Sequence, residues 1–335
     1  MTPLKTEECG RRLWHGLIPA VPVPMTSDGR IDSAAQEKYV AYMRQQPIVG
    51  VALWAHTGRG LHLSRDQRLQ VLQAWSRGLG PDKLIIAGVG GAPASATTFS
   101  AYVDSALEMA NDALQHGAHA FLTYAPSPLR KIAAEGELDK LVVDYHWKLA
   151  SLHAPLILFY LYEAAGGISY SPEVLRPLFT LPEVVGIKLA TLDSVMTFQN
   201  VANLISEEFP EKVLITGEDR FLGYSLMAGA QAALIGMGAA CTELQHNMMD
   251  AYFSGHAMEF LDLSGAVDRL SQALFIPPME GYIRRMLWTL VHLGVIGRES
   301  AHDPWGPELP GEEFSRIRET LTAVGEFDNP KSAKD

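Results

Sequence analysis

One lysine interrupts an otherwise apolar run in the middle of the 335-residue chain. The run from Glu183 to Ala190 places Lys188 among valine, glycine, isoleucine, leucine and alanine, which is typical of a strand buried on both faces. An unpaired ammonium is costly to bury, so such a lysine either reaches water at the strand's end or loses its proton. A neutral lysine attacks carbonyl carbons and forms a Schiff base. The run by itself leaves both interpretations open.

Strand-like runs alternate with helical patterns on both sides of this lysine. The predicted strands occupy residues 16–24, 49–55, 84–89, 120–123, 156–160, 183–190, 213–216 and 232–235. Eight βα units over roughly 240 residues have the size of a closed (β/α)8 TIM barrel, which we predict. A doubly wound open sheet is the alternative. No linker rich in proline, glycine or serine divides the series, which favours one domain.

The chain beyond the predicted barrel continues as helices, with helical patterns at 242–255, 258–274 and 283–294. We therefore expect four parts: an N-terminal segment at 1–15, the barrel at 16–240, C-terminal helices packed on the barrel at 241–325, and a flexible tail at 326–335. Catalytic groups of such a barrel belong at the C-terminal ends of the strands. This topology nominates the segments 56–60, 123–128, 160–167, 188–191 and 216–220.

The composition describes a compact globular protein, with 47% hydrophobic and 19% charged residues. A net charge of −11 without a lysine or arginine cluster argues against nucleic acid and anionic membrane as partners. Cys9 and Cys241 lack ligand spacing, so we expect no disulfide and no metal site, and a cytoplasmic location fits. The N-terminus lacks the apolar core of a signal peptide. Residues 88–91 do not form a dinucleotide fingerprint, and no cofactor is expected.

Several short motifs occur in an order that points to a family. They are Thr57-Gly58, Ala87-Gly88-Val89-Gly90, Tyr160 followed seven residues later by Gly167, Gly186-Ile187-Lys188, and Thr216-Gly217-Glu218-Asp219. From about Leu17 to about Gly297 the chain resembles the dihydrodipicolinate synthase / N-acetylneuraminate lyase family of pyruvate-dependent lyases. The resemblance implies a (β/α)8 barrel with C-terminal helices, usually assembled as a tetramer.

The resemblance also implies catalytic roles. Lys188 would attack the C2 carbonyl of a 2-oxo acid, and the protonated imine would act as an electron sink for bonds at C3. Tyr160 falls at the family's catalytic tyrosine and would relay protons, with Tyr162 as a nearby rival. A core aromatic residue with a satisfied hydroxyl is the simpler interpretation of Tyr160 on its own.

Further positions would bind the substrate. By the resemblance, Thr57 and Gly58 would hold the substrate carboxylate through a hydroxyl and backbone N–H groups. Leu234 falls where the family offers a backbone carbonyl near the lysine. Asp219 aligns with a residue that binds sugar hydroxyls in the sialic-acid branch, and it is equally suited to cap the following helix.

The chain departs from the family at the loop after the second predicted strand. His56 replaces a hydroxyl residue and Arg59 an acidic one. His56 is suited to take over a missing proton relay together with Tyr160, because imidazole titrates near neutral pH. Arg59 would pair with an acidic group of the substrate or with Glu163. The simpler alternative is that His56 fills the pocket wall and Arg59 faces solvent.

Two further departures disfavour dihydrodipicolinate synthesis. Ser127-Pro128 stands where the synthases have a tyrosine pair, and Ala165 stands where they bind a second carboxylate with arginine.

The sequence thus predicts a cofactor-free Schiff-base lyase or aldolase of a 2-oxo acid, with pyruvate as product or co-substrate. The expected assembly is a homo-oligomer, either a dimer or a tetramer. The alternatives are a dehydratase of a 2-oxo-3-deoxy sugar acid, a non-catalytic 2-oxo-acid-binding relative, and a phosphate-binding barrel that uses Gly236-Met237-Gly238.

Overall fold

Eight parallel strands form a nearly closed barrel in the computed structural model, which describes residues 4–192 and 194–326. The strand order is β1-β8-β7-β6-β5-β4-β3-β2, and the two ends of this series meet through a bridge between Ala20 and Ala52. The predicted (β/α)8 barrel is confirmed, and the open doubly wound sheet is excluded. The strands are β1 Leu17–Pro19, β2 Gly50–Leu53, β3 Leu84–Gly88, β4 Ala120–Tyr124, β5 Leu156–Leu161, β6 Val184–Ala190, β7 Val213–Thr216 and β8 Ala232–Ile235.

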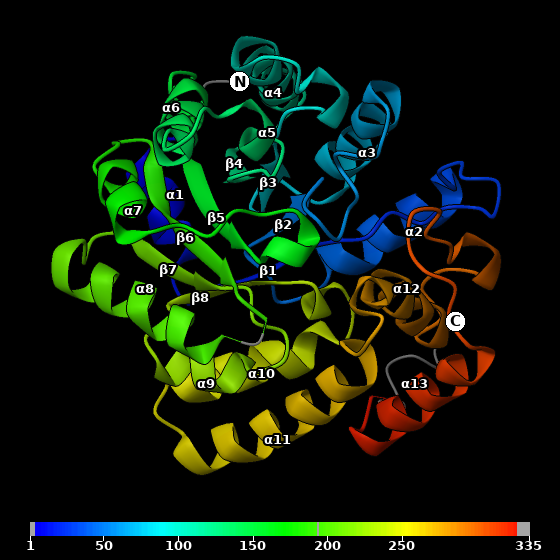
Figure 1. The fold of residues 1–335 in the computed structure, drawn as a ribbon. Coiled ribbons are helices and arrows are strands. Elements are labelled where there is room, and N and C mark those ends of the chain that lie inside the picture. The colour runs from blue at the N-terminus through cyan, green and yellow to red at the C-terminus, as the bar shows by residue number, and fades with distance from the viewer. Residues whose placement is uncertain (1–3, 193, 327–335) are drawn as a thin grey trace.

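Helices surround the strands, and three more lie beyond the ring (Figure 1). The helix α10 follows β8 and contacts β1, so it completes the alternation, and α11 to α13 are additional. The sequence patterns did not single out α1, α5 or α13. The helices are α1 Thr6–Leu13, α2 Ser33–Arg44, α3 Arg65–Gly78, α4 Phe99–Gln115, α5 Leu129–Ile132, α6 Leu138–Ala150, α7 Pro172–Phe179, α8 Val195–Glu208, α9 Leu222–Met227, α10 Thr242–Phe253, α11 Ala257–Leu274, α12 Tyr282–His292 and α13 Gly311–Ala323. The expected tail at 326–335 lies, apart from its first residue, outside the described residues.

Side-chain caps fix where several helices begin. Ser64 and Gln67 form a complete capping box at the start of α3, and the Thr98 hydroxyl accepts a hydrogen bond from the N–H of Ala101 at the start of α4. The α2 helix is capped by Asp32, whose side chain accepts a hydrogen bond from the N–H of Ala35. These caps set the ends of the loops that cross the barrel mouth.

The buried residues form two layers. The inner layer fills the barrel with alternate side chains of every strand, and the outer layer packs the strands against the helices. The α1 helix contributes Cys9 and Leu13 to the inner layer, and its Gly10 packs near Val185 and Val213 at the N-terminal ends of β6 and β7. Because α1 covers this end of the barrel, the C-terminal ends of the strands are the mouth that can admit a substrate.

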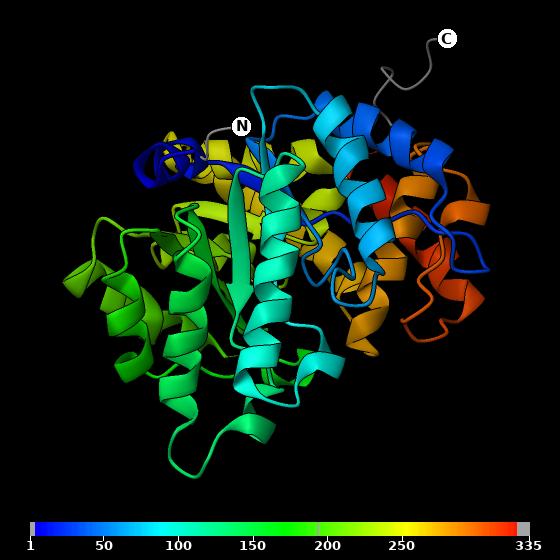
Figure 2. The same ribbon diagram turned by 90° about the horizontal axis from the view of Figure 1, so that it is seen from above.

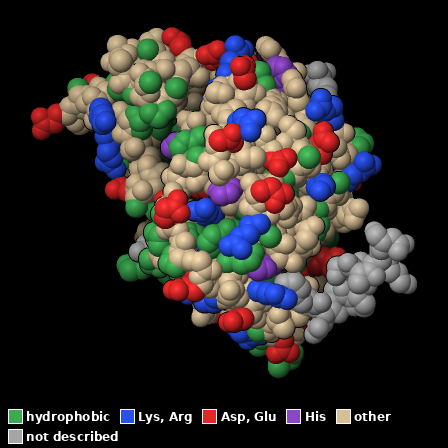
Figure 3. All heavy atoms as spheres, turned by 90° about the vertical axis from the view of Figure 1, so that its right-hand side faces the viewer, with side chains coloured by type: hydrophobic (Ala, Val, Ile, Leu, Met, Phe, Trp, Pro, Cys, Tyr) green, Lys and Arg blue, Asp and Glu red, His purple; other side chains and the backbone are tan. Residues whose placement is uncertain are grey.

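The molecular surface mixes charges of both signs. On the face shown in Figure 3, acidic and basic side chains are interspersed. Figure 2 shows the C-terminal helices beside α2 and α3 on one side of the barrel. Within residues 4–192 and 194–326, none of the helices is both long and apolar enough to span a membrane.

Candidate active site

Lys188 lies inside the barrel near its C-terminal mouth. It belongs to β6, where it is paired in register with Phe159 of β5 and Ile215 of β7. The side chain is 6% exposed, and its Nζ lies 4.1 Å from the centroid of the Phe159 ring. A side chain at Gly217 would overlap with Cε of Lys188, so glycine at this position leaves room for the lysine. Lys188 therefore opens into a pocket rather than snorkelling to bulk water.

Two buried carboxyl groups partly offset the effect of desolvation on the pKa of this amine. Burial lowers the pKa of Lys188, while the charges of Asp219 and Glu218 raise it, and the net shift is downward. Burial likewise raises the pKa of Asp219, whose Oδ1 accepts a hydrogen bond from the N–H of Met237 at 2.7 Å. Glu218 is held by the N–H groups of Thr191 and Leu192, yet burial raises its pKa to about 7. The pKa of about 8 gives the amine a far larger neutral fraction near neutral pH than an ordinary lysine has, and a carboxyl group lies beside it.

The loop after β2 brings Thr57 and His56 to the same pocket. The Thr57 hydroxyl lies 2.9 Å from the hydroxyl of Tyr282, which reaches in from α12. Gly58 packs against Val21 and Trp54 and does not line the pocket. Leu234 lies on β8 with its side chain in the inner layer, below the pocket.

A polar cluster at the mouth centres on Glu280, from the segment between α11 and α12. Its carboxylate oxygens lie 2.9 Å and 3.1 Å from Nε2 of His56, and Oε1 accepts a hydrogen bond from the Tyr162 hydroxyl at 3.2 Å. Nη1 of Arg59 donates to Oε2 at 2.8 Å. Burial alone would raise the pKa of Glu280, but His56 and Arg59 together lower it to about 2. Glu280 is therefore a carboxylate that links an imidazole to a phenol.

The structure does not bring Tyr160 to the lysine. Phe159 and Leu161 occupy the inner layer, and Tyr160 between them points outward, with its ring 5.8 Å from that of Tyr170. Side chains alternate between the two faces along a strand, which is why the neighbour of an inward residue points out. After β5 ends at Leu161 the chain turns over the mouth, and this turn directs Tyr162 into the lysine pocket.

Three partnerships expected from the sequence are corrected. Arg59 pairs with Asp303 through Nε and Nη2, and with Glu280, and not with Glu163. Glu163 accepts instead from Arg130.

His56 bonds Glu280 rather than Tyr160, because Tyr160 faces the helix layer. Asp219 does not cap α9, whose N-cap residue is Phe221 and which has no side-chain cap.

Four residues of the site were not found from the sequence: Phe159 and Tyr282, which line the pocket, and Glu280 and Asp303, which bond His56 and Arg59 at its mouth. Three of them come from the C-terminal helical region, which the strand pattern does not place relative to the mouth. One signal pointed to Glu280, because it is the single charged residue in the apolar, proline-containing segment from Phe275 to Tyr282. In the part of the chain that the structure describes, no group of three or more histidine, cysteine or acidic residues is arranged to hold a metal ion.

The fold and site define a (β/α)8 barrel that presents a buried lysine with a lowered pKa at its C-terminal mouth. The family model of the dihydrodipicolinate synthetase family matches residues 13–323, and the chain belongs to this family.

Known relatives carry different activities within that family. The 4-hydroxy-tetrahydrodipicolinate synthase of Synechococcus sp. (strain CC9605) is 27% identical over 262 residues, which cover 77% of this chain and 80% of that protein. The N-acetylneuraminate lyase of Gallus gallus is 29% identical over 233 residues, covering 67% of this chain and 69% of that protein.

Solved structures show the same fold. Dihydrodipicolinate synthase from Oceanobacillus iheyensis superposes with a TM-score of 0.79 at 18% identity, covering 96% of this chain and 99% of that chain. N-acetylneuraminate lyase from Mycoplasma synoviae gives a TM-score of 0.72 at 17% identity, covering 94% and 98%. The family is that of lyases, and the particular substrate has to be argued from this chain's own pocket.

Proposed function

We propose that the protein is a class I lyase in which Lys188 forms a Schiff base with the C2 carbonyl of a 2-oxo acid. The reaction would make or break the bond between C3 and C4, with pyruvate as co-substrate or product. The observation that carries the proposal is the position of the Lys188 amine, which is buried beside Phe159 and Asp219 at the mouth of the barrel. A neutral amine in such a site is a nucleophile toward carbonyl carbon.

Each stage of this reaction has a suitable group in the pocket. Thr57 is positioned to hold the substrate carboxylate through its hydroxyl, which Tyr282 orients. The positive charge of the protonated imine would face the carboxyl group of Asp219. Imine formation releases water, and cleavage between C3 and C4 removes the proton of a C4 hydroxyl, so a proton carrier is needed. We assign that role to His56 and Tyr162, joined through Glu280.

The pocket disfavours three other activities. Arg59 is fully engaged by Asp303 and Glu280, which leaves it unsuited to bind the second carboxylate of a dihydrodipicolinate precursor. Gly236 packs near Tyr282 and Phe275 instead of opening a phosphate cradle. A connected set of proton-carrying groups is also more than simple 2-oxo-acid binding needs. Dehydration of a sugar acid would use the same imine, and analysis of the reaction products distinguishes it from cleavage of the C3–C4 bond.

Borohydride reduction in the presence of pyruvate tests the Schiff base. We expect irreversible labelling of the intact protein, mapped to the peptide that contains Lys188, and no labelling of Lys188→Met. Lys212 is a matched control, because burial also lowers its pKa but its Nζ donates to the carbonyl of Val184 at the other end of β6. Labelling of Lys212, or equal labelling of Lys188→Met, would contradict the proposal.

Assembly as a dimer or tetramer and a cytoplasmic location belong to the same proposal. The family supports both, and the two free cysteines, Cys9 and Cys241, also fit a cytoplasmic location.

A further inference from the structure

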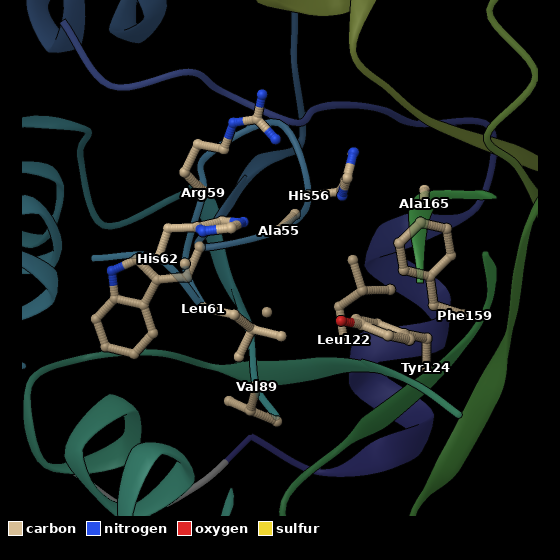
Figure 4. A pocket seen from close by; sticks show the side chains of 13 residues that line it. Ala55, His56, Arg59, Leu61, His62, Val89, Leu122, Tyr124, Phe159 and Ala165 are labelled. Atoms are coloured by element: carbon tan, nitrogen blue, oxygen red, sulfur yellow. The ribbon is translucent and has the colours of Figure 1, made fainter. Parts of the chain in front are cut away.

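A second chamber adjoins the lysine pocket on the side of β2, β3 and β4. Its cavity volume is about 90 Å³, and it shares His56 and Phe159 with the lysine pocket. Figure 4 shows Leu61, Val89 and Leu122 lining this space together with the rings of Tyr124 and Phe159. A substrate bound to Lys188 and extended past His56 would enter this chamber.

The wall of the chamber is mainly apolar and aromatic. Besides the residues labelled in Figure 4, it includes Trp54, whose Nε1 donates to the carbonyl of Arg68 at 3.1 Å and is therefore satisfied. The Tyr124 ring meets the Phe159 ring edge-on at 6.1 Å. Among the residues that line the chamber, Tyr124 carries the only side-chain hydroxyl.

Two polar side chains at the rim, Arg59 and His56, are already paired. Arg59 donates through three of its nitrogens to Asp303 and Glu280, and Figure 4 shows its guanidinium at the rim, directed away from Leu61 and Val89. His56 is bonded to Glu280. His62 stacks on Trp305 at 5.6 Å, and burial lowers its pKa, which favours the neutral ring. The chamber therefore offers no free cation to a carboxylate and few partners to a chain of hydroxyls.

We propose that this chamber holds the C4 substituent of the 2-oxo acid, and that the substituent is a flat apolar group such as an aryl ring. The inference rests on the proposed function and names its aldehyde partner as aromatic or apolar. An aryl ring would bury its faces against Trp54, Phe159 and Tyr124. A polyhydroxylated or acidic group would lose its hydration without replacement hydrogen bonds, which costs affinity.

The reaction in the synthetic direction balances without any further reagent. The imine of Lys188-bound pyruvate loses a proton from C3 to the proton carrier, and the enamine carbon C3 then attacks the aldehyde carbon and forms the C3–C4 bond. The electron pair of the aldehyde carbonyl becomes a C4 alkoxide, which takes one proton. His56, at the junction of the two pockets, is placed to give that proton. Hydrolysis of the imine then releases a 4-aryl-4-hydroxy-2-oxo acid and the free amine.

A panel of aldehydes tests this assignment. With pyruvate in excess, kcat/KM is measured by mass-spectrometric product analysis for benzaldehyde, glyoxylate and glyceraldehyde. We expect kcat/KM for benzaldehyde to exceed the values for glyoxylate and glyceraldehyde by at least ~10-fold, which is the discrimination that a shaped apolar pocket provides. Equal values, or preference for glyoxylate or glyceraldehyde, would overturn the inference.

Two neighbouring alanines provide a matched pair of variants. Ala165 lines the chamber, whereas Ala164 is exposed and does not. Ala165→Phe should lower the ratio of kcat/KM for benzaldehyde over acetaldehyde by at least ~10-fold, because it fills the chamber. Ala164→Phe should leave that ratio unchanged. An unchanged ratio in Ala165→Phe would count against the chamber.

Borohydride trapping with pyruvate on the same preparations distinguishes failure of the proposed function from failure of the chamber assignment. Absence of trapping at Lys188 in the unaltered protein would refute the proposed function itself. Trapping at Lys188 without a preference for benzaldehyde would refute only the assignment of the chamber.

Discussion

Two tyrosines two residues apart in sequence lie in different environments. Tyr160 packs in the helix layer, whereas Tyr162 donates a hydrogen bond to Glu280 in the lysine pocket. Strand alternation by itself would place both on the outer face, and the turn after Leu161 reverses the direction of Tyr162. Gly167 allows this turn, because a side chain there would overlap with the carbonyl of Leu161.

This arrangement makes a prediction that separates the two residues. Tyr162→Phe should lower kcat by about 10²-fold or more, the contribution of a positioned proton carrier. Tyr160→Phe should stay within about twofold of the unaltered protein, because its hydroxyl does not line the pocket. Steady-state kinetics of pyruvate consumption with an accepted aldehyde measures both variants. A large loss of kcat in Tyr160→Phe with none in Tyr162→Phe would contradict the assignment of the proton-carrying role to Tyr162.

The sequence correctly predicted that Lys188 is buried, but it misplaced the side chains around the lysine, and the difference has a physical reason. Burial of Lys188 follows from the apolar run around it, which is local information. The direction of a tyrosine at a strand end depends on the backbone turn that follows, and that turn is set by packing against residues far away in the chain. Glu280 and Tyr282 reach the pocket from a region more than 90 residues after Lys188, so no spacing rule could find them.

At the scale of the elements, a buried histidine joins α6 to the segment between β5 and α7. His146 is completely buried, with Nδ1 2.7 Å from the carbonyl oxygen of Val142 and Nε2 3.0 Å from the Tyr170 hydroxyl. These contacts suit a neutral ring that donates through Nδ1 and accepts through Nε2. Burial lowers the pKa of His146 from 6.5 to about 4.

The shift makes the folded state sensitive to acid. Between pH 6.5 and pH 4 the unfolded chain binds a proton at this residue and the folded chain does not, so stability falls as the pH falls. At about 1.4 kcal/mol for each pKa unit, the full effect is about 3 kcal/mol. Urea unfolding between pH 7 and pH 4 should show that the free energy of unfolding decreases less with falling pH in His146→Gln than in the unaltered protein. His256→Gln, at an exposed histidine, is the control, and its free energy of unfolding should depend on pH as in the unaltered protein.

Strand positions were predicted closely, and terminal helices were not. The predicted bounds of β7 and β8 agree with the structure residue for residue. In a chain that alternates strands and helices, a short β-branched or alanine-rich run between turn residues indicates a strand. The sequences of α1 and α13 are rich in charged residues and have few apolar positions. Each packs through a narrow stripe, Cys9 and Leu13 in α1 and Ile317 and Leu321 in α13, which is too short a pattern to identify beforehand.

For the molecule as a whole, the C-terminal helices complete the candidate active site. Arg285 of α12 is fully buried, and its Nη1 donates to the carbonyl oxygens of Leu274, Ile276 and Pro278. Its Nε donates to Glu313 of α13 at 2.7 Å. The guanidinium thus ties α13 to the segment that carries Glu280 over the barrel mouth. We infer that α13 positions Glu280 without touching the substrate.

Removing the partner of this buried guanidinium tests the connection. Glu313→Ala should lower the free energy of unfolding by about 3–5 kcal/mol, because it leaves a buried charge without its counter-ion. Glu312→Ala, at the exposed neighbour in the same helical turn, should change it by less than about 0.5 kcal/mol. Urea unfolding followed by circular dichroism measures both variants. At a temperature where Glu313→Ala is still fully folded, its kcat should fall while borohydride trapping at Lys188 persists, because Glu280 is displaced and the lysine is not. A destabilised variant with unchanged kcat would show that α13 supports the fold and does not position Glu280.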